Sequence, residues 1–152
     1  MPVTFKPVRV TDIDRTVAMM QDFYAIDNYP IDPLVSKSLL KEFIDNEELG
    51  RSWLILNNDE VVGYVILTFI FSFEYKGRIA FLDELYIAPA GRGKSIGKQT
   101  VDFIHEQALD LAINVIYLEV EGHNTIAQKL YLSKDFTIHN RKLMKLTVKN
   151  KK

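Results

Sequence analysis

The segment from Arg92 to Gly97 has the composition of a turn that binds phosphate groups. It lies between an apolar stretch of the chain and a helical pattern that starts near Lys94. Its glycines allow a tight turn and a close approach of the backbone to a ligand. The first amides of a helix have no partner within the helix, and the helix dipole places partial positive charge beside them. Because Arg92 and Lys94 add full charges there, the segment predicts a site for a diphosphate.

Two well-known phosphate motifs do not describe this segment. The string G-x-x-x-x-G-K-[ST] does not occur in it. It is also no dinucleotide fingerprint, because the glycine spacing differs and several antiparallel strands are expected before it. A basic loop that only caps a helix is the alternative interpretation of these six residues, so the surrounding sequence has to decide.

Composition narrows the classes of function. The net charge is −1, from 19 Lys and Arg against 20 Asp and Glu, which predicts no nucleic-acid partner. The chain has no cysteine, and its three histidines lie far apart, so we expect neither a thiolate nor a zinc site. The first 20 residues do not resemble a signal peptide, and residues 61–73 are too short to span a bilayer. We expect a cytoplasmic protein without a membrane segment.

Apolar periodicity predicts one domain over residues 1–152 with alternating strands and helices. Strands are expected over residues 3–10, 52–56, 61–73, 79–87 and 114–120, with a closing hairpin from 136–138 and 143–148. Helices are expected over residues 13–24, from Asp32-Pro33 onward, from about Lys94 to Leu111, and from about Thr125 to Lys134. The order predicts an α/β (α+β) fold, with a mixed, mostly antiparallel sheet of about seven strands and about four flanking helices.

Several motifs around the turn resemble the GNAT superfamily of acyl-CoA-dependent N-acyltransferases. The family pattern is an acid-Leu-Tyr-Val-x-Pro strand, followed by Gln or Arg, two variable residues, Gly, one variable residue, and Gly or Ala. Residues 83–89 read DELYIAP, and residues 92–97 read RGKSIG. The segment from Leu118 to Phe136, with Asn124 and Tyr131, resembles the family's second cofactor segment, and residues 61–64 resemble its third strand. The resemblance covers nearly the whole chain and implies a GNAT fold.

Two residues depart from the family pattern. Ser95 stands where the family usually has glycine, and Asp135 stands where a glycine usually precedes Phe136. A serine amide still donates to phosphate, but its Cβ narrows the approach. Replacing Ser95 by Gly is therefore expected to leave acetyl-CoA affinity equal or better.

The resemblance implies transfer of an acetyl group from acetyl-CoA to a primary amine by direct attack. This reaction needs an amide donor for the oxyanion, a route for the amine's proton, and an acid for the thiolate. By resemblance, Tyr131 is the acid, Asn124 contacts the cofactor arm, and a bulged strand presents free amides to it. The implied cofactor-binding set is Leu85, Tyr86, Ile87, Arg92, Gly93, Lys94, Ser95, Ile96, Gly97 and Asn124. Tyr131 as a core aromatic is the alternative.

The base is selected among carboxylates near the turn. Asp83 and Glu84 are adjacent on a strand and point to opposite faces. If Leu85 and Ile87 face a covering helix, Asp83 would be buried and Glu84 would face the other side, unless a bulge shifts the count. We rank Glu84 first, Asp83 second and Glu119 third, with Glu121 as a further candidate. A solvated or ion-paired carboxylate is the alternative for each, and a water chain without a single base is another route.

The acceptor is expected to be a small amine, a polyamine or a lysine of a peptide or protein, because aromatic and acidic residues occur together in predicted loops. Phe69 and Phe71 are expected in the core. A CoA-binding sensor or interaction domain that keeps the fold without turnover is the alternative function. A homodimer is possible because dimers are frequent in the family.

Overall fold

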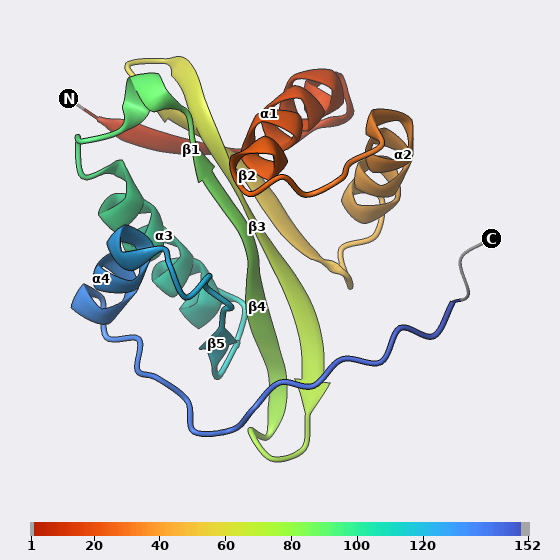
Figure 1. Ribbon diagram of the computed structural model, residues 1–152, viewed down its shortest axis with the longest axis vertical. Coiled ribbons are helices and arrows are strands. Elements are labelled where there is room, and N and C mark those ends of the chain that lie inside the picture. The colour runs from red at the N-terminus through yellow and green to blue at the C-terminus, as the bar shows by residue number, and fades with distance from the viewer. Residues whose placement is uncertain (1, 150–152) are drawn as a thin grey trace.

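Five strands form one sheet in the order β1-β2-β3-β4-β5. The computed structural model describes residues 2–149 (Figure 1). The elements along the chain are β1 (Val3–Pro7), the 3-10 turn η1 (Val10–Asp12), α1 (Ile13–Ile26), α2 (Pro33–Ile44), β2 (Gly50–Asn57), β3 (Glu60–Ser72), β4 (Gly77–Ile87), the 3-10 turn η2 (Pro89–Gly91), α3 (Ile96–Asp110), β5 (Ile116–Tyr117) and α4 (Thr125–Ser133).

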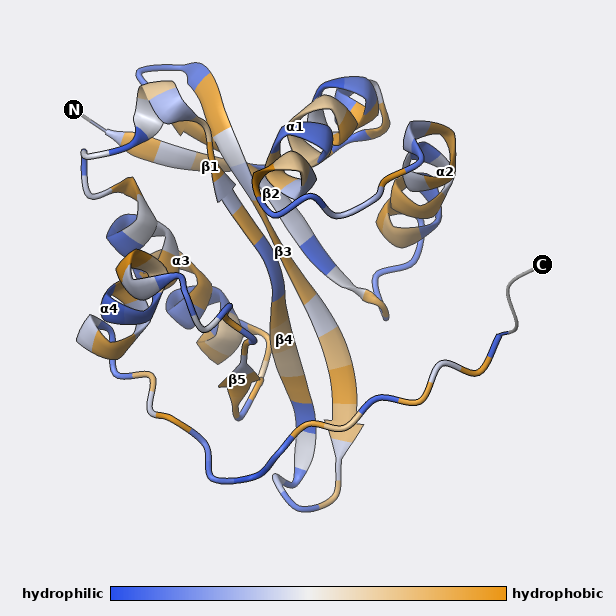
Figure 2. Ribbon diagram, in the orientation of Figure 1, coloured by the Kyte–Doolittle hydropathy of each residue, from blue (hydrophilic) through white to orange (hydrophobic). Residues whose placement is uncertain are grey.

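Strands β1 to β4 form an antiparallel meander, and β5 runs parallel to β4. Helices α1 and α2 cover one face of the sheet, and α3 and α4 cover the other (Figure 1). Each face has its own apolar cluster. Val17, Leu54 and Tyr64 belong to the cluster under α1 and α2, whereas Ile55 and Ile104 belong to the one under α3. Both helical layers therefore bury one apolar side each, and Figure 2 shows the hydrophobic and hydrophilic residues alternating along them.

Local chemistry explains the helix boundaries that the sequence predicts. The Asp32 carboxylate accepts hydrogen bonds from the Leu34 and Val35 amides, and Pro33 occupies the first helical position of α2. Proline suits that position because its missing N–H would have no partner there. None of the described helices is long and apolar enough to cross a membrane.

The expected number of strands was wrong, because the described part of the sheet has five strands and not about seven. The strand predicted over residues 114–120 contracts to two residues, and residues 136–138 and 143–148 lie outside any strand. A strand forms only where a neighbouring edge accepts its amides, and apolar alternation does not supply that edge. The expected core position of Phe71 was also wrong, since its side chain is 70% exposed.

A β-bulge interrupts β4 beside the turn. Ile66 pairs with Glu84 and Leu67 pairs with Leu82, so Asp83 is an extra residue without a partner on β3. Such a bulge shifts the alternation of side chains between the two faces. Asp83 is consequently exposed, although Leu85 and Ile87 do pack against the cluster under α3. This bulge is the exception under which the sequence does not predict a buried Asp83.

Gly63 permits the close approach of β3 to β4 next to the bulge. A Cβ at this residue would lie 2.0 Å from the carbonyl oxygen of Tyr86. We therefore expect Gly63→Ala to lower the free energy of unfolding by on the order of 1–3 kcal/mol, because the two strands must separate. Thermal unfolding measures the effect. Gly122→Ala is the control, since its Cβ would meet nothing within 4 Å. Equal unfolding temperatures for the two variants would contradict the close strand approach.

Candidate functional site

The edge of β4 that faces β5 is open over half its length. Strand β5 pairs only with Ala80 and Phe81, through contacts that include the bond from the Ala80 amide to the Val115 carbonyl at 2.9 Å. From Leu82 to Ile87, no described strand lies along this edge. The two parallel strands thus diverge, and the free edge leads directly into the turn before α3.

Main-chain groups on this edge alternate in direction. The Ala88 amide donates to the Val62 carbonyl at 2.7 Å, and the Tyr86 carbonyl faces Gly63, so both residues face β3. In an antiparallel pair each intervening residue faces the other way. Leu85 and Ile87 therefore present their main-chain groups at the open edge, where the Ile87 carbonyl accepts from Arg92 Nε at 2.9 Å. Tyr86 instead contributes a buried ring, 6.0 Å below the Arg92 guanidinium.

The turn before α3 exposes a run of free amides. Within the described chain, the amides of residues 93–98 donate to no protein group, and the first amide of α3 with a partner is that of Gln99, on the Ser95 carbonyl. The first turn of α3 contains no acidic residue. Arg92 and Lys94 lie in the same turn, where Lys94 Nζ reaches the Ala90 carbonyl at 3.2 Å. Free amides at a helix start, beside two cations, are groups of the kind that bind anions such as phosphate.

Both departures from the family pattern fall on left-handed backbone. Ser95 has φ 61° and Asp135 has φ 71°, values that glycine adopts without strain. Ser95 precedes α3, and its side chain makes no capping hydrogen bond. Ile96 is buried in the core, so only its amide faces the turn. Gly97 lies under α4, since a Cβ there would be 3.1 Å from Leu130 Cδ2. At Ser95, Gly97 and Asp135, where the family has glycine, a side chain therefore lowers the free energy of unfolding, through backbone strain or through close contact.

Glu84 lies on the opposite side of β4, between two tyrosine hydroxyls. Tyr24 of α1 donates to one carboxylate oxygen at 2.5 Å, and Tyr64 of β3 donates to the other at 2.7 Å. Burial raises the pKa of Glu84 above the ordinary carboxyl value, the two hydrogen bonds oppose this shift, and the nearby Asp83 charge adds to it. Burial, followed by the Glu84 carboxylate, also raises the pKa of Tyr24, so this hydroxyl remains a donor.

The other candidate bases have less enclosed positions. Asp83 is exposed on the bulge, although neighbouring atoms desolvate its carboxylate enough to raise the pKa. Glu119 is exposed after β5. Glu121 accepts a hydrogen bond from the Tyr29 hydroxyl at 2.5 Å. Among the four carboxylates considered, Glu84 is the one held by two fixed donors.

Two contacts join loops from opposite faces of the sheet. Tyr29 of the α1–α2 loop contacts Glu121 of the β5–α4 loop, and Asp27 contacts His123 Nε2 at 3.1 Å in the same pair of loops. The loops therefore lie side by side. They bring Asp27 and Tyr29, two of the residues expected in or beside loops, next to His123 and Glu121.

Tyr131 and Asn124 belong to α4. The Asn124 side chain caps the helix by accepting from the Ala127 amide at 3.0 Å. Tyr131 is half-buried against the cluster under α3, and burial raises its pKa to about 12. Its hydroxyl has no hydrogen-bond partner among residues 2–149, yet it is not sealed from solvent. Tyr131 thus combines the predicted core packing with a free donor.

A model of the Acetyltransferase (GNAT) family matches residues 17–136. The chain belongs to this family. A thialysine N-epsilon-acetyltransferase of Bos taurus is 37% identical over 71 residues, which are 47% of this chain and 41% of that protein. The chain thus spans less than half of that relative. The D-amino-acid N-acetyltransferase HPA3 of Saccharomyces cerevisiae is 21% identical over 134 residues, covering 85% and 81% of the two chains.

Solved structures share the fold of this GNAT chain. A predicted acetyltransferase from Clostridium acetobutylicum, crystallised with acetyl-CoA, superposes with a TM-score of 0.80 at 16% identity, over 95% of this chain and 96% of that one. The sheet with its flanking helices is therefore the GNAT architecture that the sequence predicts.

The sequence alone did not indicate the two tyrosines that hold Glu84. Helical spacing placed Tyr24 at the end of the first helix, beside a loop expected to face the acceptor, and Tyr64 was expected only as part of a strand. A buried tyrosine hydroxyl needs a hydrogen-bond partner, which is the one hint that the sequence offers. The partners lie 60 and 20 residues away along the chain.

No cluster of three or more metal-ligating side chains occurs within residues 2–149.

Ser95→Gly tests the account of the turn. Because the backbone of Ser95 is in the left-handed conformation, we expect the free energy of unfolding of the variant to rise by roughly 1 kcal/mol from relieved strain. Acetyl-CoA should bind equally well or more tightly, measured by calorimetry. Ser95→Ala is the matched control, since it keeps the strain and removes the hydroxyl. A large loss of affinity in both variants would mean that the hydroxyl itself is a ligand and that free amides do not suffice.

Proposed function

We propose that this GNAT chain is an N-acetyltransferase that transfers the acetyl group of acetyl-CoA to a primary amine by direct attack. The proposal rests chiefly on the open β4 edge that leads into a turn with six free amides. The family of the chain and the acetyl-CoA bound in a neighbour of the same fold support it.

In this proposal, different groups of the chain bind different parts of the cofactor. The amides of residues 93–98, with Arg92 and Lys94, bind the pyrophosphate. The main-chain groups of Leu85 and Ile87 bind the pantetheine arm, and an amide of this pair stabilises the oxyanion. Asn124 is already engaged as a helix cap, so its contact with the cofactor arm has to be made by its remaining amide group.

Glu84 is the proposed base. An amine is mostly protonated at neutral pH, and a carboxylate whose pKa is raised by burial is a better acceptor for its proton. Tyr24 and Tyr64 fix both carboxylate oxygens, which positions the base without an ion pair. Asp83 and Glu119, or a chain of water molecules, are the other routes for this proton.

Tyr131 is the proposed acid for the leaving thiolate. With a pKa of about 12 it keeps its proton at neutral pH, and its hydroxyl has no competing partner among the described residues. A thiolate has a lower proton affinity than this phenol, so the transfer needs close contact or concerted protonation.

The acceptor proposed is a cationic amine: a small amine, a polyamine or a lysine side chain. Asp27, Tyr29 and Glu121 meet between the two joined loops, and carboxylates with aromatic rings favour a cation. The relatives named thialysine N-epsilon-acetyltransferase and D-amino-acid N-acetyltransferase agree with an amine acceptor. We place the protein in the cytoplasm, in keeping with its lack of cysteine.

A cofactor-binding sensor without turnover is the second candidate. The observation that favours it is the pairing of Glu84 with two tyrosine hydroxyls, because such a pairing also serves a purely structural role. Release of free CoA thiol from acetyl-CoA, measured across a panel of amines, separates the two functions. An enzyme releases thiol in the presence of its acceptor, whereas a sensor binds acetyl-CoA and releases none.

Glu84→Gln tests the base. We expect kcat/KM to fall by roughly 10²- to 10⁴-fold. In the wild type, kcat/KM should rise with pH around the raised pKa of Glu84 and then level off. The variant should lose this rising limb of the pH profile. A raised pKa means that the charged carboxylate contributes no stability at neutral pH, so the unfolding temperature of the variant should not fall. Asp83→Asn is the matched control. If it removes the limb instead, the ranking of the bases is wrong.

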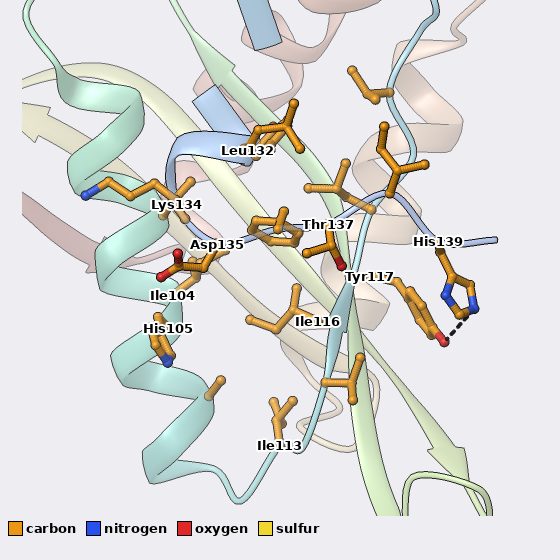
Figure 3. Close-up of a pocket in the computed structure, with 18 of the residues that line it drawn as sticks. Ile104, His105, Ile113, Ile116, Tyr117, Leu132, Lys134, Asp135, Thr137 and His139 are labelled. Carbon is orange, nitrogen blue, oxygen red and sulfur yellow. Dashed lines mark hydrogen bonds between the residues drawn. The ribbon is translucent and has the colours of Figure 1, made fainter. Parts of the chain in front are cut away.

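Tyr131→Phe tests the acid. We expect kcat to fall at least tenfold with an unchanged dissociation constant for acetyl-CoA, because only the proton donor is removed. Stability should hold, since the hydroxyl has no partner in the described chain. Tyr117→Phe is the control: its hydroxyl bonds to Tyr75, and both tyrosines line, together with Tyr131, a cavity between α3, β5 and the segment after α4 (Figure 3). Unchanged turnover of Tyr131→Phe at every pH would leave Tyr131 as a core aromatic.

A further inference from the structure

Arg92 holds a main-chain group of the open β4 edge. Its Nε donates to the Ile87 carbonyl at 2.9 Å, five residues back along the chain. That carbonyl belongs to the part of the edge along which no described strand lies. The central carbon of the same guanidinium is 6.0 Å from the centre of the buried Tyr86 ring. The Arg92 side chain therefore lies back over the end of β4.

The Ile87 carbonyl is also one of the groups assigned above to the pantetheine arm. Leu85 and Ile87 each present one carbonyl and one amide at the open edge. Arg92 thus occupies one of the two carbonyls of this pair. An N–H group of the arm has to approach that oxygen to about 3 Å, and the guanidinium already lies there. The arm and the Arg92 side chain therefore compete for the same place on the edge.

A diphosphate in the turn attracts Arg92 away from this edge. The chain leaves β4, passes through η2 and enters α3 (Figure 1), and Arg92 directly precedes the free amides of residues 93–98. A diphosphate bound by these amides offers several charged oxygens, to which a guanidinium can donate two parallel hydrogen bonds. The Ile87 carbonyl is neutral and accepts one bond from Arg92. The attraction between full charges therefore favours the diphosphate.

Lys94 provides a contrast within the same turn. Its Nζ reaches the Ala90 carbonyl at 3.2 Å. Ala90 belongs to η2, beyond the end of β4, so this contact leaves the main-chain groups of Leu85 and Ile87 uncovered. Both Arg92 and Lys94 have exposed side chains. The two cations thus differ in one respect that matters here, namely which carbonyl they hold.

We propose that Arg92 couples the two halves of the cofactor site, so that the chain selects thioesters whose carrier contains a diphosphate. This inference rests on the proposed function. When no diphosphate is bound, Arg92 covers the Ile87 carbonyl and the pantetheine arm binds weakly. A diphosphate in the turn moves Arg92 and frees that carbonyl for an amide of the arm. Because both ligands favour the same position of Arg92, each strengthens the binding of the other.

The coupling has a consequence for the choice of acetyl donor. A thioester on a free pantetheine arm, or on an arm that ends in a single phosphate, offers Arg92 a weaker partner than a diphosphate does. Such a donor leaves the Ile87 carbonyl covered for more of the time and is bound less tightly. Arg92 therefore acts as a specificity-determining residue as well as a ligand of the diphosphate.

Two fragments of the cofactor, pantetheine and ADP, test the coupling in the wild-type chain. The dissociation constant of pantetheine is measured by NMR titration with and without saturating ADP. We expect ADP to lower this constant by at least about fivefold, and pantetheine to lower that of ADP by the same factor. AMP is the matched ligand control, because it carries a single phosphate. It should lower the constant for pantetheine by less than about twofold.

Arg92→Ala and Lys94→Ala form a matched pair of variants for the same titrations. Arg92→Ala should remove the coupling, and it should bind pantetheine alone roughly threefold more tightly than the wild type, because the Ile87 carbonyl is uncovered. Lys94→Ala should bind ADP more weakly and keep the coupling factor of the wild type. Both substitutions remove exposed side chains, so we expect both variants to fold, which thermal unfolding checks.

Several results would overturn the inference. They are wild-type pantetheine binding that ADP does not change, a coupling that persists in Arg92→Ala or disappears in Lys94→Ala, and pantetheine binding that is no tighter in Arg92→Ala than in the wild type. Each leaves the proposed function intact, since acetyl-CoA would still bind and react. Failure of both fragments and of acetyl-CoA to bind the wild type would instead remove the proposed function, and this inference with it.

Discussion

The separation of β4 from β5 is the constraint on which the site depends. The two strands pair at Ala80 and Phe81 and then diverge, which leaves the main-chain groups of Leu85 and Ile87 without strand partners. The bulge at Asp83 lies at the same point and resets the alternation of side chains. As a result, Leu85 and Ile87 pack toward α3, while Glu84 faces α1 on the other side of the sheet. One irregularity thus provides both an open edge and an enclosed carboxylate.

The turn before α3 shows how backbone conformation constrains the sequence. The first amides of any helix are free, and here the chain enters α3 through two left-handed residues, Gly93 and Ser95, so that the free run begins at residue 93. Glycine adopts that conformation without strain, and serine does so at a cost. Ser95 and Asp135 are therefore more than deviations from a family pattern. They mark two places where this chain tolerates backbone strain, one in the turn proposed for the cofactor and one at the exit of α4.

The face beside β5 gives the molecule a second unsatisfied edge, of a different kind. On β4 the open edge adjoins a polar turn, whereas on β5 it adjoins an apolar cavity. The first suits the phosphate-bearing cofactor of the proposed function. The second has apolar side chains beside it, and Tyr131 lines the same cavity.

The sequence alone determined much of this protein. Periodicity and capping residues predicted the order of elements through α4, and the motifs from Asp83 to Gly97 predicted the family. Phosphate binding by the turn stays a prediction. These features depend on neighbours along the chain, where spacing and propensity act directly. Only the tertiary structure decided that Asp83 is a bulge residue, that Tyr24 and Tyr64 hold Glu84, and that residues 143–148 form no strand within the described chain. Each of these depends on which edges and side chains meet across the sheet, and alternation of apolar residues does not specify such partners.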